Sequence, residues 1–157
     1  MSQPWLAELQ ATIDREIPMC PQMGIRVQAF GEEGLSMGMP LARNHNHQRT
    51  GFAGSLNALC TVAGWGSVFL LIRRHGLRGD IVIRRSAIRY LKPVSLPQII
   101  ARCLPVGSEE EQHFVEMLAD KGQAKLDVTV EITDGECTAV SFHGSYVVLD
   151  GNVAAAE

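Results

Sequence analysis

Two stretches of the chain carry hydrophobic residues at helical spacing. Near the N-terminus, apolar side chains recur every three or four positions, at Trp5, Leu6, Leu9, Ile13 and Ile17. This spacing predicts an amphipathic helix over residues 4–17, which Pro18 ends. A second helix is predicted over residues 53–75, apolar on nearly every side, with Gly76 just beyond its last turn. A helix of that kind is expected to be covered by the rest of the protein.

Other hydrophobic stretches predict strands. One pair, over residues 25–30 and 35–41, is joined across glycines in a hairpin-like connection, and a polar loop over residues 43–51 follows. Later strands are predicted over residues 80–91, 99–106, 124–132 and 139–149. In the third of these, every second residue is apolar and the others are polar, which is typical of an antiparallel strand with one wet face.

A short helix is predicted between the later strands. Ser108 and Glu111 match a capping box at its start, and Lys121 with Gly122 matches its end. The order is then helix, two strands, one long apolar helix and a run of antiparallel strands. This order predicts an α+β fold in which an antiparallel β-sheet wraps around a long central helix.

The apolar stretch from Phe52 to Ile72 is long enough to span a membrane, because it holds no charged side chain. Serine, threonine, asparagine and glycine residues dilute its hydrophobicity, however, and the rest of the chain predicts a sheet. We therefore expect a fully buried helix and no membrane span.

Composition favours one compact domain covering residues 1–157, since 46% of the residues are hydrophobic and 20% are charged. The 14 basic and 17 acidic residues give a formal charge of −3, so we expect no nucleic-acid partner. The four cysteines form no Cys-x-x-Cys pair, and the N-terminus lacks the pattern of a secretory signal. Reduced thiols and a cytoplasmic protein are expected.

Histidines offer little support for a metal site. His45 and His47 lie two residues apart in the polar loop, but no third ligand is near them in the sequence, and no metal is expected. His47 is a candidate proton carrier, because an exposed imidazole titrates near neutral pH; the alternative is an exposed histidine without a role.

Residues 44–66 read NHNHQRTGFAGSLNALCTVAGWG, and residues 80–94 read DIVIRRSAIRYLKPV. Both stretches resemble the YiiD C-terminal-type thioesterase family of the hotdog superfamily, close to the pattern N-H-x-G-T-x-F-G-G-S-x-x-A-L-x-x-x-A-G-W-G. The resemblance covers most of the chain. It implies the hotdog fold, in which two protomers pair their sheets side by side and acyl thioesters bind at the dimer interface.

The start of the long helix makes chemical sense as a site. Backbone N–H groups at a helix start have no intrahelical acceptor, so those near Gly54 are expected to stabilise the oxyanion of a thioester intermediate. Ala53, Gly54 and Ser55 are small and let a ligand approach closely. The alternative is a tightly packed helix start without a ligand.

Two positions follow from the resemblance to PaaI-like hotdog thioesterases. Asn46 lies where those enzymes carry an asparagine that positions the water or the carbonyl. Thr61 lies where they often carry an acidic base or nucleophile, and a threonine cannot replace it unaided. Three functional interpretations are then open: Thr61 orients a water, the protein is a weak catalyst, or the protein binds thioesters without cleaving them. The alternative to any functional role is that Thr61 is a core threonine bonded to the preceding turn. Arg49 and Ala53 also depart from the pattern, which has glycine at both positions.

Seven of the basic residues lie between positions 73 and 92. In a hotdog protein the strand from Asp80 would lie at the dimer edge. Four side chains on it are candidates for contact with the phosphates of coenzyme A or the acidic surface of an acyl carrier protein: Arg84, Arg85, Arg89 and Lys92. A solvated strand face that protects a sheet edge is the alternative. Phe52 and Trp65 are candidates to line an acyl pocket, the alternative being ordinary core packing.

The sequence therefore predicts a homodimer, or a tetramer, that hydrolyses acyl-CoA or acyl-carrier-protein thioesters by water attack. No cofactor is expected beyond the coenzyme A of the substrate. The first rival is a non-catalytic acyl-CoA binding or sensing module, which the threonine at position 61 favours. A hotdog dehydratase or hydratase is a second rival, although the long helix has neither the histidine nor the carboxylate that this chemistry needs.

Overall fold

The computed structural model describes residues 3–153, so the first two and the last four residues of the expected domain lie outside the described part. The chain passes in order through α1 (Gln3–Glu16), α2 (Met19–Met23), β1 (Arg26–Gly31), β2 (Gly34–Pro40), a 3-10 turn (Leu41–Arg43), α3 (Ala53–Arg74), β3 (Leu77–Tyr90), β4 (Gln98–Cys103), α4 (Ser108–Lys121), β5 (Ala124–Asp134) and β6 (Cys137–Val153). Each helix and strand expected from the sequence is present. The short helix α2 was not expected.

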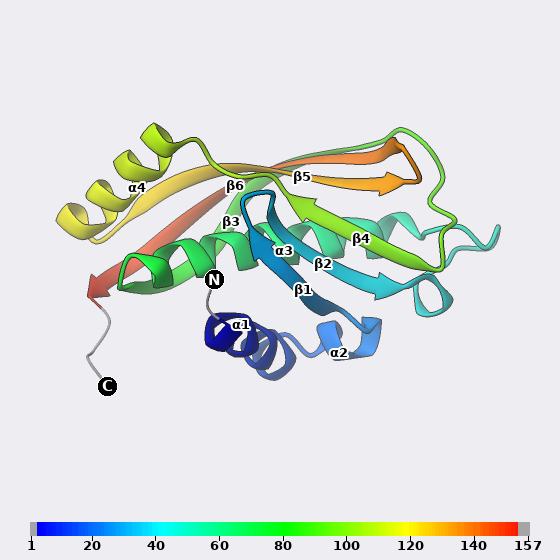
Figure 1. Ribbon diagram of the computed structural model, residues 1–157, viewed down its shortest axis with the longest axis horizontal. Coiled ribbons are helices and arrows are strands. Elements are labelled where there is room, and N and C mark those ends of the chain that lie inside the picture. The colour runs from blue at the N-terminus through cyan, green and yellow to red at the C-terminus, as the bar shows by residue number, and fades with distance from the viewer. Residues whose placement is uncertain (1–2, 154–157) are drawn as a thin grey trace.

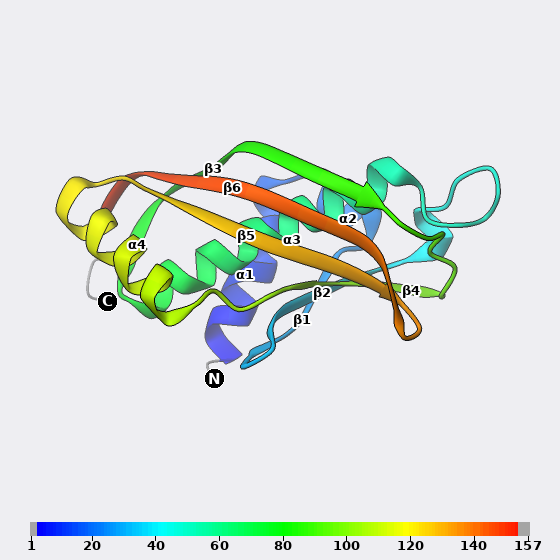
Figure 2. The same ribbon diagram turned by 90° about the horizontal axis from the view of Figure 1, so that it is seen from above.

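Six strands form one antiparallel sheet in the order β1-β2-β4-β5-β6-β3. Figure 2 shows β3 at one edge of this sheet and β1 at the other, with α3 lying behind the strands. Helix α1 packs against α3 and β1 (Figure 1). The expected α+β arrangement, a sheet wrapped around a long central helix, is confirmed.

Helix α3 is the core of the molecule. It is long and apolar enough to cross a bilayer by composition, but 72% of its most apolar window is buried inside the protein. Its packing against β6 is close: a Cβ atom at Gly64 would lie 2.4 Å from Tyr146 Oη, which donates a 2.6 Å hydrogen bond to the Thr61 carbonyl. The sheet and the helix therefore meet at a position where only glycine fits.

The two faces of the sheet differ in character. Along β5 the residues alternate between buried and accessible, as the sequence predicts, and the apolar set faces α3. Residues directly opposite each other on paired strands share a face, so Arg85 and Ser145 lie on the same side as Asp127. We call the side turned away from α3 the outer face.

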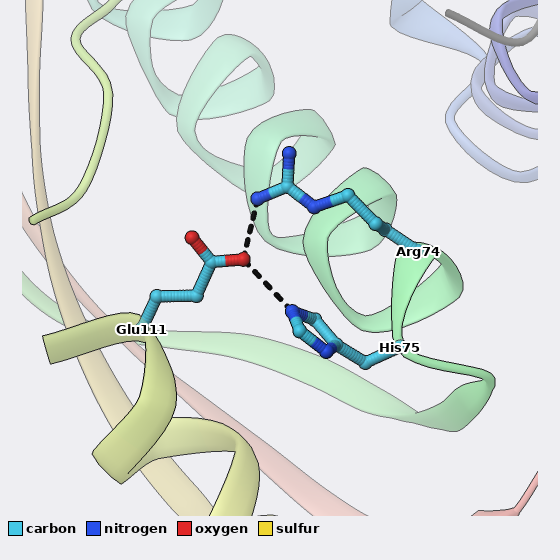
Figure 3. Close-up of polar contacts among 3 residues, drawn as sticks. All are labelled: Arg74, His75 and Glu111. Atoms are coloured by element: carbon cyan, nitrogen blue, oxygen red, sulfur yellow. Dashed lines mark hydrogen bonds and ion pairs between the residues drawn. The ribbon is translucent and has the colours of Figure 1, made fainter. Parts of the chain in front are cut away.

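Three details differ from the sequence-based expectations. Strand β3 begins at Leu77 rather than Asp80, and the short helix α2 follows directly after Pro18. The predicted capping box is wrong: Gly107 is the N-cap of α4, and no side chain caps this end. Glu111 does not reach back because its carboxylate is bonded to Arg74 and His75 at the end of α3, as Figure 3 shows.

Three of the four cysteines, Cys20, Cys60 and Cys103, are buried, while Cys137 is exposed, and all four are free thiols as expected. Burial raises the pKa of the Cys103 thiol to about 11 and that of the Cys60 thiol to about 12. The buried thiols are therefore inert core residues.

Candidate active site at the start of helix α3

One narrow face of α3 is left partly uncovered by the rest of the chain. It consists of residues four positions apart, which lie on one side of a helix: Ala53, Asn57, Thr61 and Trp65. We call this set the α3 stripe. Ala53 is exposed and the other three are half-buried, whereas most of their neighbours on α3 are fully buried.

Strand β3 borders the α3 stripe along its length. Near the start of the helix, Tyr90 Oη donates to the Ala53 carbonyl at 3.2 Å, and three turns later Trp65 Nε1 donates to the Ile81 carbonyl at 3.2 Å. Because β3 is the edge strand of the sheet, the stripe lies beside an edge that carries no further strand within residues 3–153.

The start of α3 is open. Phe52 is the N-cap in an extended conformation, and no side chain caps the helix. The first intrahelical bond is the one from Leu56 N to Phe52 O, so the N–H groups of the preceding residues have no partner one turn back. Ala53 and Gly54 are exposed and Ser55 is half-buried, which leaves these donors accessible to a ligand.

The Phe52 ring is 51% exposed and lies directly over Gly54, where a Cβ atom would approach the ring to 2.7 Å. The structure therefore brings Phe52, Ala53, Gly54 and Ser55 together, as the sequence predicts, around an uncapped helix start. This arrangement can stabilise negative charge on a ligand oxygen.

Asn46 holds the loop that precedes the helix. Its Oδ1 accepts hydrogen bonds from the N–H groups of Gln48 at 2.8 Å and Thr50 at 3.1 Å. Its Nδ2 donates to Thr50 Oγ1 at 2.9 Å and to the Gly51 carbonyl at 3.4 Å. Both amide atoms are occupied, so in this conformation Asn46 shapes the loop.

Asn44, two residues earlier, is a structural residue that the sequence analysis did not single out. It is buried, and its Nδ2 donates to the carbonyls of Met23 at 2.9 Å and Pro40 at 2.8 Å. Its own carbonyl accepts from Phe52 N at 2.8 Å, which closes the base of the loop. No local sequence pattern marks this role, because all three of its partners are backbone groups.

The remaining loop residues are exposed. Arg49 adopts a left-handed conformation with φ 66°, and its Nη1 lies 2.9 Å from His45 Nε2. His47 is exposed at the surface of the same loop. Among residues 3–153, no three histidine, cysteine or acidic side chains gather as metal ligands.

Thr61 makes the bond expected of a helix threonine, because its Oγ1 donates to the Asn57 carbonyl at 2.8 Å. Asn57 Oδ1 lies 3.5 Å from the same hydroxyl. Asn57 was missed by the sequence analysis, although a polar pair four residues apart on an otherwise apolar helix is a detectable signal. Asn57 and Thr61 are the two polar side chains of the α3 stripe.

The aromatic candidates are separated. Trp65 stacks on Phe69 with ring centroids 5.4 Å apart and lines a cavity of about 430 Å³ with Arg73 and Ile81. Phe52 lies three turns away, at the start of the helix. Leu59 and Val62, on the other faces of α3, are buried core residues.

The three arginines of β3 that the sequence singles out, Arg84, Arg85 and Arg89, lie on the outer face, whereas Arg78 lines the cavity beside Trp65. Arg85 and Arg89 pair with Ser145 and Ser141, and a bulge between Ile83 and Arg85 accommodates Arg84. Arg85 lines a cavity of about 620 Å³. Lys92 follows the strand, and its Nζ donates to Cys137 Sγ at 3.3 Å. These side chains are not gathered with the α3 stripe.

Solved structures share this architecture. A putative thioesterase from Shewanella oneidensis is 32% identical, with a TM-score of 0.78 over 94% of this chain and 99% of that one. A protein of unknown function from Chlorobaculum tepidum is 25% identical, with a TM-score of 0.87 over 92% and 93% of the two chains. A thioesterase from Haemophilus influenzae is 18% identical, with a TM-score of 0.67 over 92% and 90%, and supports the fold alone.

The antiparallel sheet wrapped around a central helix, shared with these proteins, is the hotdog fold of thioesterases. The family model described as "Putative thioesterase (yiiD_Cterm)" matches residues 6–150. The chain belongs to this family, which indicates a thioester hydrolase.

Proposed function

We propose that the protein hydrolyses acyl-CoA or acyl-carrier-protein thioesters by water attack at the start of α3. The observation that carries the proposal is the uncapped, accessible helix start formed by Phe52, Ala53 and Gly54, which lies within the residues that the family model matches. The thioester carbonyl oxygen lies against the N–H groups near Gly54. These N–H groups stabilise the oxyanion that forms when water adds to the carbonyl carbon.

Thr61 and Asn57 hold the water in this proposal. The Thr61 hydroxyl donates to a helix carbonyl, so its oxygen remains an acceptor for a water proton. Asn57 lies one turn nearer to Gly54 on the same stripe. Collapse of the tetrahedral intermediate breaks the C–S bond, and the thiolate leaves with the proton that the water lost. This chemistry requires no metal or redox cofactor.

Asn46 acts as a positioning residue for the loop. An aspartate at this position keeps the acceptor for the N–H groups of Gln48 and Thr50, whereas alanine removes it. If loop order is the role of Asn46, Asn46→Asp, which keeps the acceptor but loses the Nδ2 donor to Thr50 and Gly51, retains part of the hydrolysis rate, and Asn46→Ala loses more of it. Loss of kcat in both variants with the loop intact would instead assign Asn46 to direct contact with the substrate.

The uncovered edge of β3 supports a homodimer. This strand has 14 residues, and Val82, Ile83 and Tyr90 are exposed on it. Unpaired edges of this length pair readily with another strand. A second copy paired along β3 would also cover the α3 stripe and place the site at the interface.

The arginines of β3 support an anionic carrier group on the substrate. Arg85 and Arg89 lie on the outer face, so a coenzyme A or an acyl carrier protein must pass around the edge of β3 to reach them. Lys92 comes two residues after Tyr90, whose hydroxyl donates to the Ala53 carbonyl, and His47 lies in the loop that precedes α3. Replacing Arg85 and Arg89 together by glutamine raises KM and leaves kcat largely unchanged if they bind only the carrier.

A non-catalytic acyl-CoA binding module is the second candidate. It is favoured by the absence of any Asp, Glu or His side chain on α3 between Ala53 and Ile72. Thiol release from acyl-CoAs of graded chain length separates the two candidates. The proposal expects turnover that Asn46→Ala and Thr61→Ala reduce, while tight binding of every acyl-CoA without thiol release would establish the binding module.

A further inference from the structure

A third cavity, of about 480 Å³, lies between α4 and the outer face of the sheet. Three cationic side chains line it, namely Arg84, Lys121 and Lys125, together with the apolar side chains of Met117 and Val147. None of the described residues that line it is acidic. Helix α4 lies at the end of the molecule opposite the loop that precedes α3 (Figures 1 and 2), so this cavity is separate from the candidate active site.

We propose that this cavity binds a small amphipathic carboxylate, that is, an acyl chain ending in a carboxylate. The cationic side chains take the carboxylate, and Met117 and Val147 contact the chain. That this acid is a product of the protein's own reaction rests on the proposed function. The recognition chemistry of the cavity does not.

The charges of the cavity are largely uncompensated. Arg84 and Lys121 form no ion pair with any carboxylate in the described part of the chain. Lys125 Nζ lies 3.4 Å from Asp127 Oδ2, and both side chains are well exposed, so this pair is weak. An anion that enters the cavity therefore gains at least two free cationic donors.

A β-bulge directs Arg84 to this position. The register of β3 and β6 shifts between Ile83, which pairs with Tyr146, and Arg85, which pairs with Ser145. With regular alternation only one of two adjacent arginines would face outward; the bulge lets both do so. Arg84 then lines this cavity and Arg85 lines the neighbouring one.

The apolar part of the cavity selects an anion with a chain. Met117 is 38% exposed on α4, and Val147 is half-buried on β6. An inorganic anion leaves this surface in contact with water, whereas an acyl chain buries it. The volume is that of a small-molecule site.

Calorimetric titration of the whole protein with octanoate tests the proposal, with acetate as the probe without a chain and octanol as the probe without a charge. We expect octanoate to bind and the other two to bind about tenfold more weakly or not at all. In Arg84→Gln combined with Lys121→Gln, the Kd for octanoate rises by about tenfold or more. Arg102→Gln, which removes an exposed arginine outside the cavity, leaves it unchanged.

Backbone amide shifts locate the bound acid. The proposal expects octanoate to shift Lys125 and Val147, and to do so equally in Asn46→Ala, so that loss of hydrolysis and loss of this site are distinguishable. Shifts confined to the start of α3, equal shifts with acetate, or no binding would overturn it. Adsorption to phosphatidylglycerol vesicles that needs Arg84 and Lys121, without octanoate binding, would overturn it in favour of a membrane surface.

Discussion

Arg49 holds a backbone conformation that favours glycine. Its φ of 66° lies in the left-handed region, and its side chain is exposed apart from a contact with His45. The family pattern has glycine at this position, and the structure supplies the physical reason for it: a residue without a Cβ atom adopts this turn without strain.

Arg49→Gly is expected to raise the free energy of unfolding by about 1 kcal/mol, because it relieves a left-handed non-glycine residue. Urea denaturation measures this change. Gln48→Gly, at the neighbouring exposed position, is the control and is expected to lower stability. If both variants destabilise the protein equally, the conformation of Arg49 carries no strain.

At the scale of elements, the contact between α3 and β6 depends on Gly64. A Cβ atom there would lie 2.4 Å from Tyr146 Oη and 2.8 Å from two of its ring carbons. The Tyr146 ring is fully buried, and its hydroxyl is already bonded to the Thr61 carbonyl. Neither element can yield without disturbing the half of α3 that carries the α3 stripe.

Gly64→Ala is therefore expected to lower the free energy of unfolding by about 1–3 kcal/mol through overpacking. Removing the hydroxyl in Tyr146→Phe relieves the shortest contact, so the same substitution should cost less in that background. Thermal unfolding of the four proteins of this cycle measures the coupling. An equal loss in both backgrounds would contradict the close approach.

The far end of α3 is joined to α4 by a charged cluster. Glu111 Oε1 accepts from Arg74, and His75 Nε2 lies 2.8 Å from the same oxygen (Figure 3). Burial raises the pKa of the Glu111 carboxyl, but the hydrogen bonds and charges of His75 and Arg74 together lower it by more. The resulting pKa lies below the ordinary value of 4.5.

A carboxyl whose pKa is lowered in the folded state stabilises the protein at pH values above its pKa in the unfolded state. This stabilisation is lost as the pH falls through the pKa of the folded state. Wild-type stability is therefore expected to fall as the pH drops below about 4.5, and Glu111→Gln should flatten this part of the profile. Glu116→Gln, on the same helix but bonded to neutral Gln112, is the control. Parallel acid profiles for Glu111→Gln and wild type would refute the role of this cluster.

For the whole molecule, the sequence predicts the fold well because burial is periodic. The alternation along β5 follows from one covered face, and the apolar character of α3 follows from its being covered on most sides. The expectation of a fully buried α3 was wrong in one respect, because the α3 stripe is left partly uncovered. The small residues around Gly54 also fell where expected, because a motif of adjacent residues remains together in any fold.

Other features depend on contacts that no local pattern encodes. The loop role of Asn46 needs Thr50 and Gly51 to fold back on it, and the anchoring of Asn44 needs Met23 and Pro40. The outward direction of Arg84 and Arg85 follows from the bulge in β3, which shifts a register that the sequence leaves undefined. The prediction of a capping box was wrong because the Glu111 carboxylate is bonded to Arg74 and His75 at the end of α3.

In the proposed mechanism, N–H groups at the start of α3 stabilise the oxyanion of a thioester. Gly54→Pro removes one such N–H in the first turn of the helix, and Gly54→Ala, which keeps the N–H but adds the Cβ atom that lies 2.7 Å from the Phe52 ring, is its matched control. Glu109→Pro removes the equivalent N–H from α4 and controls for proline at a helix start. The decisive measurement is kcat for acyl-CoA hydrolysis by the three variants and wild type, with folding checked by circular dichroism.

Gly54→Pro is expected to lower kcat by about 10²–10³-fold relative to Gly54→Ala, while Glu109→Pro leaves kcat unchanged. A folded Gly54→Pro variant with the kcat of Gly54→Ala would show that the oxyanion is stabilised elsewhere.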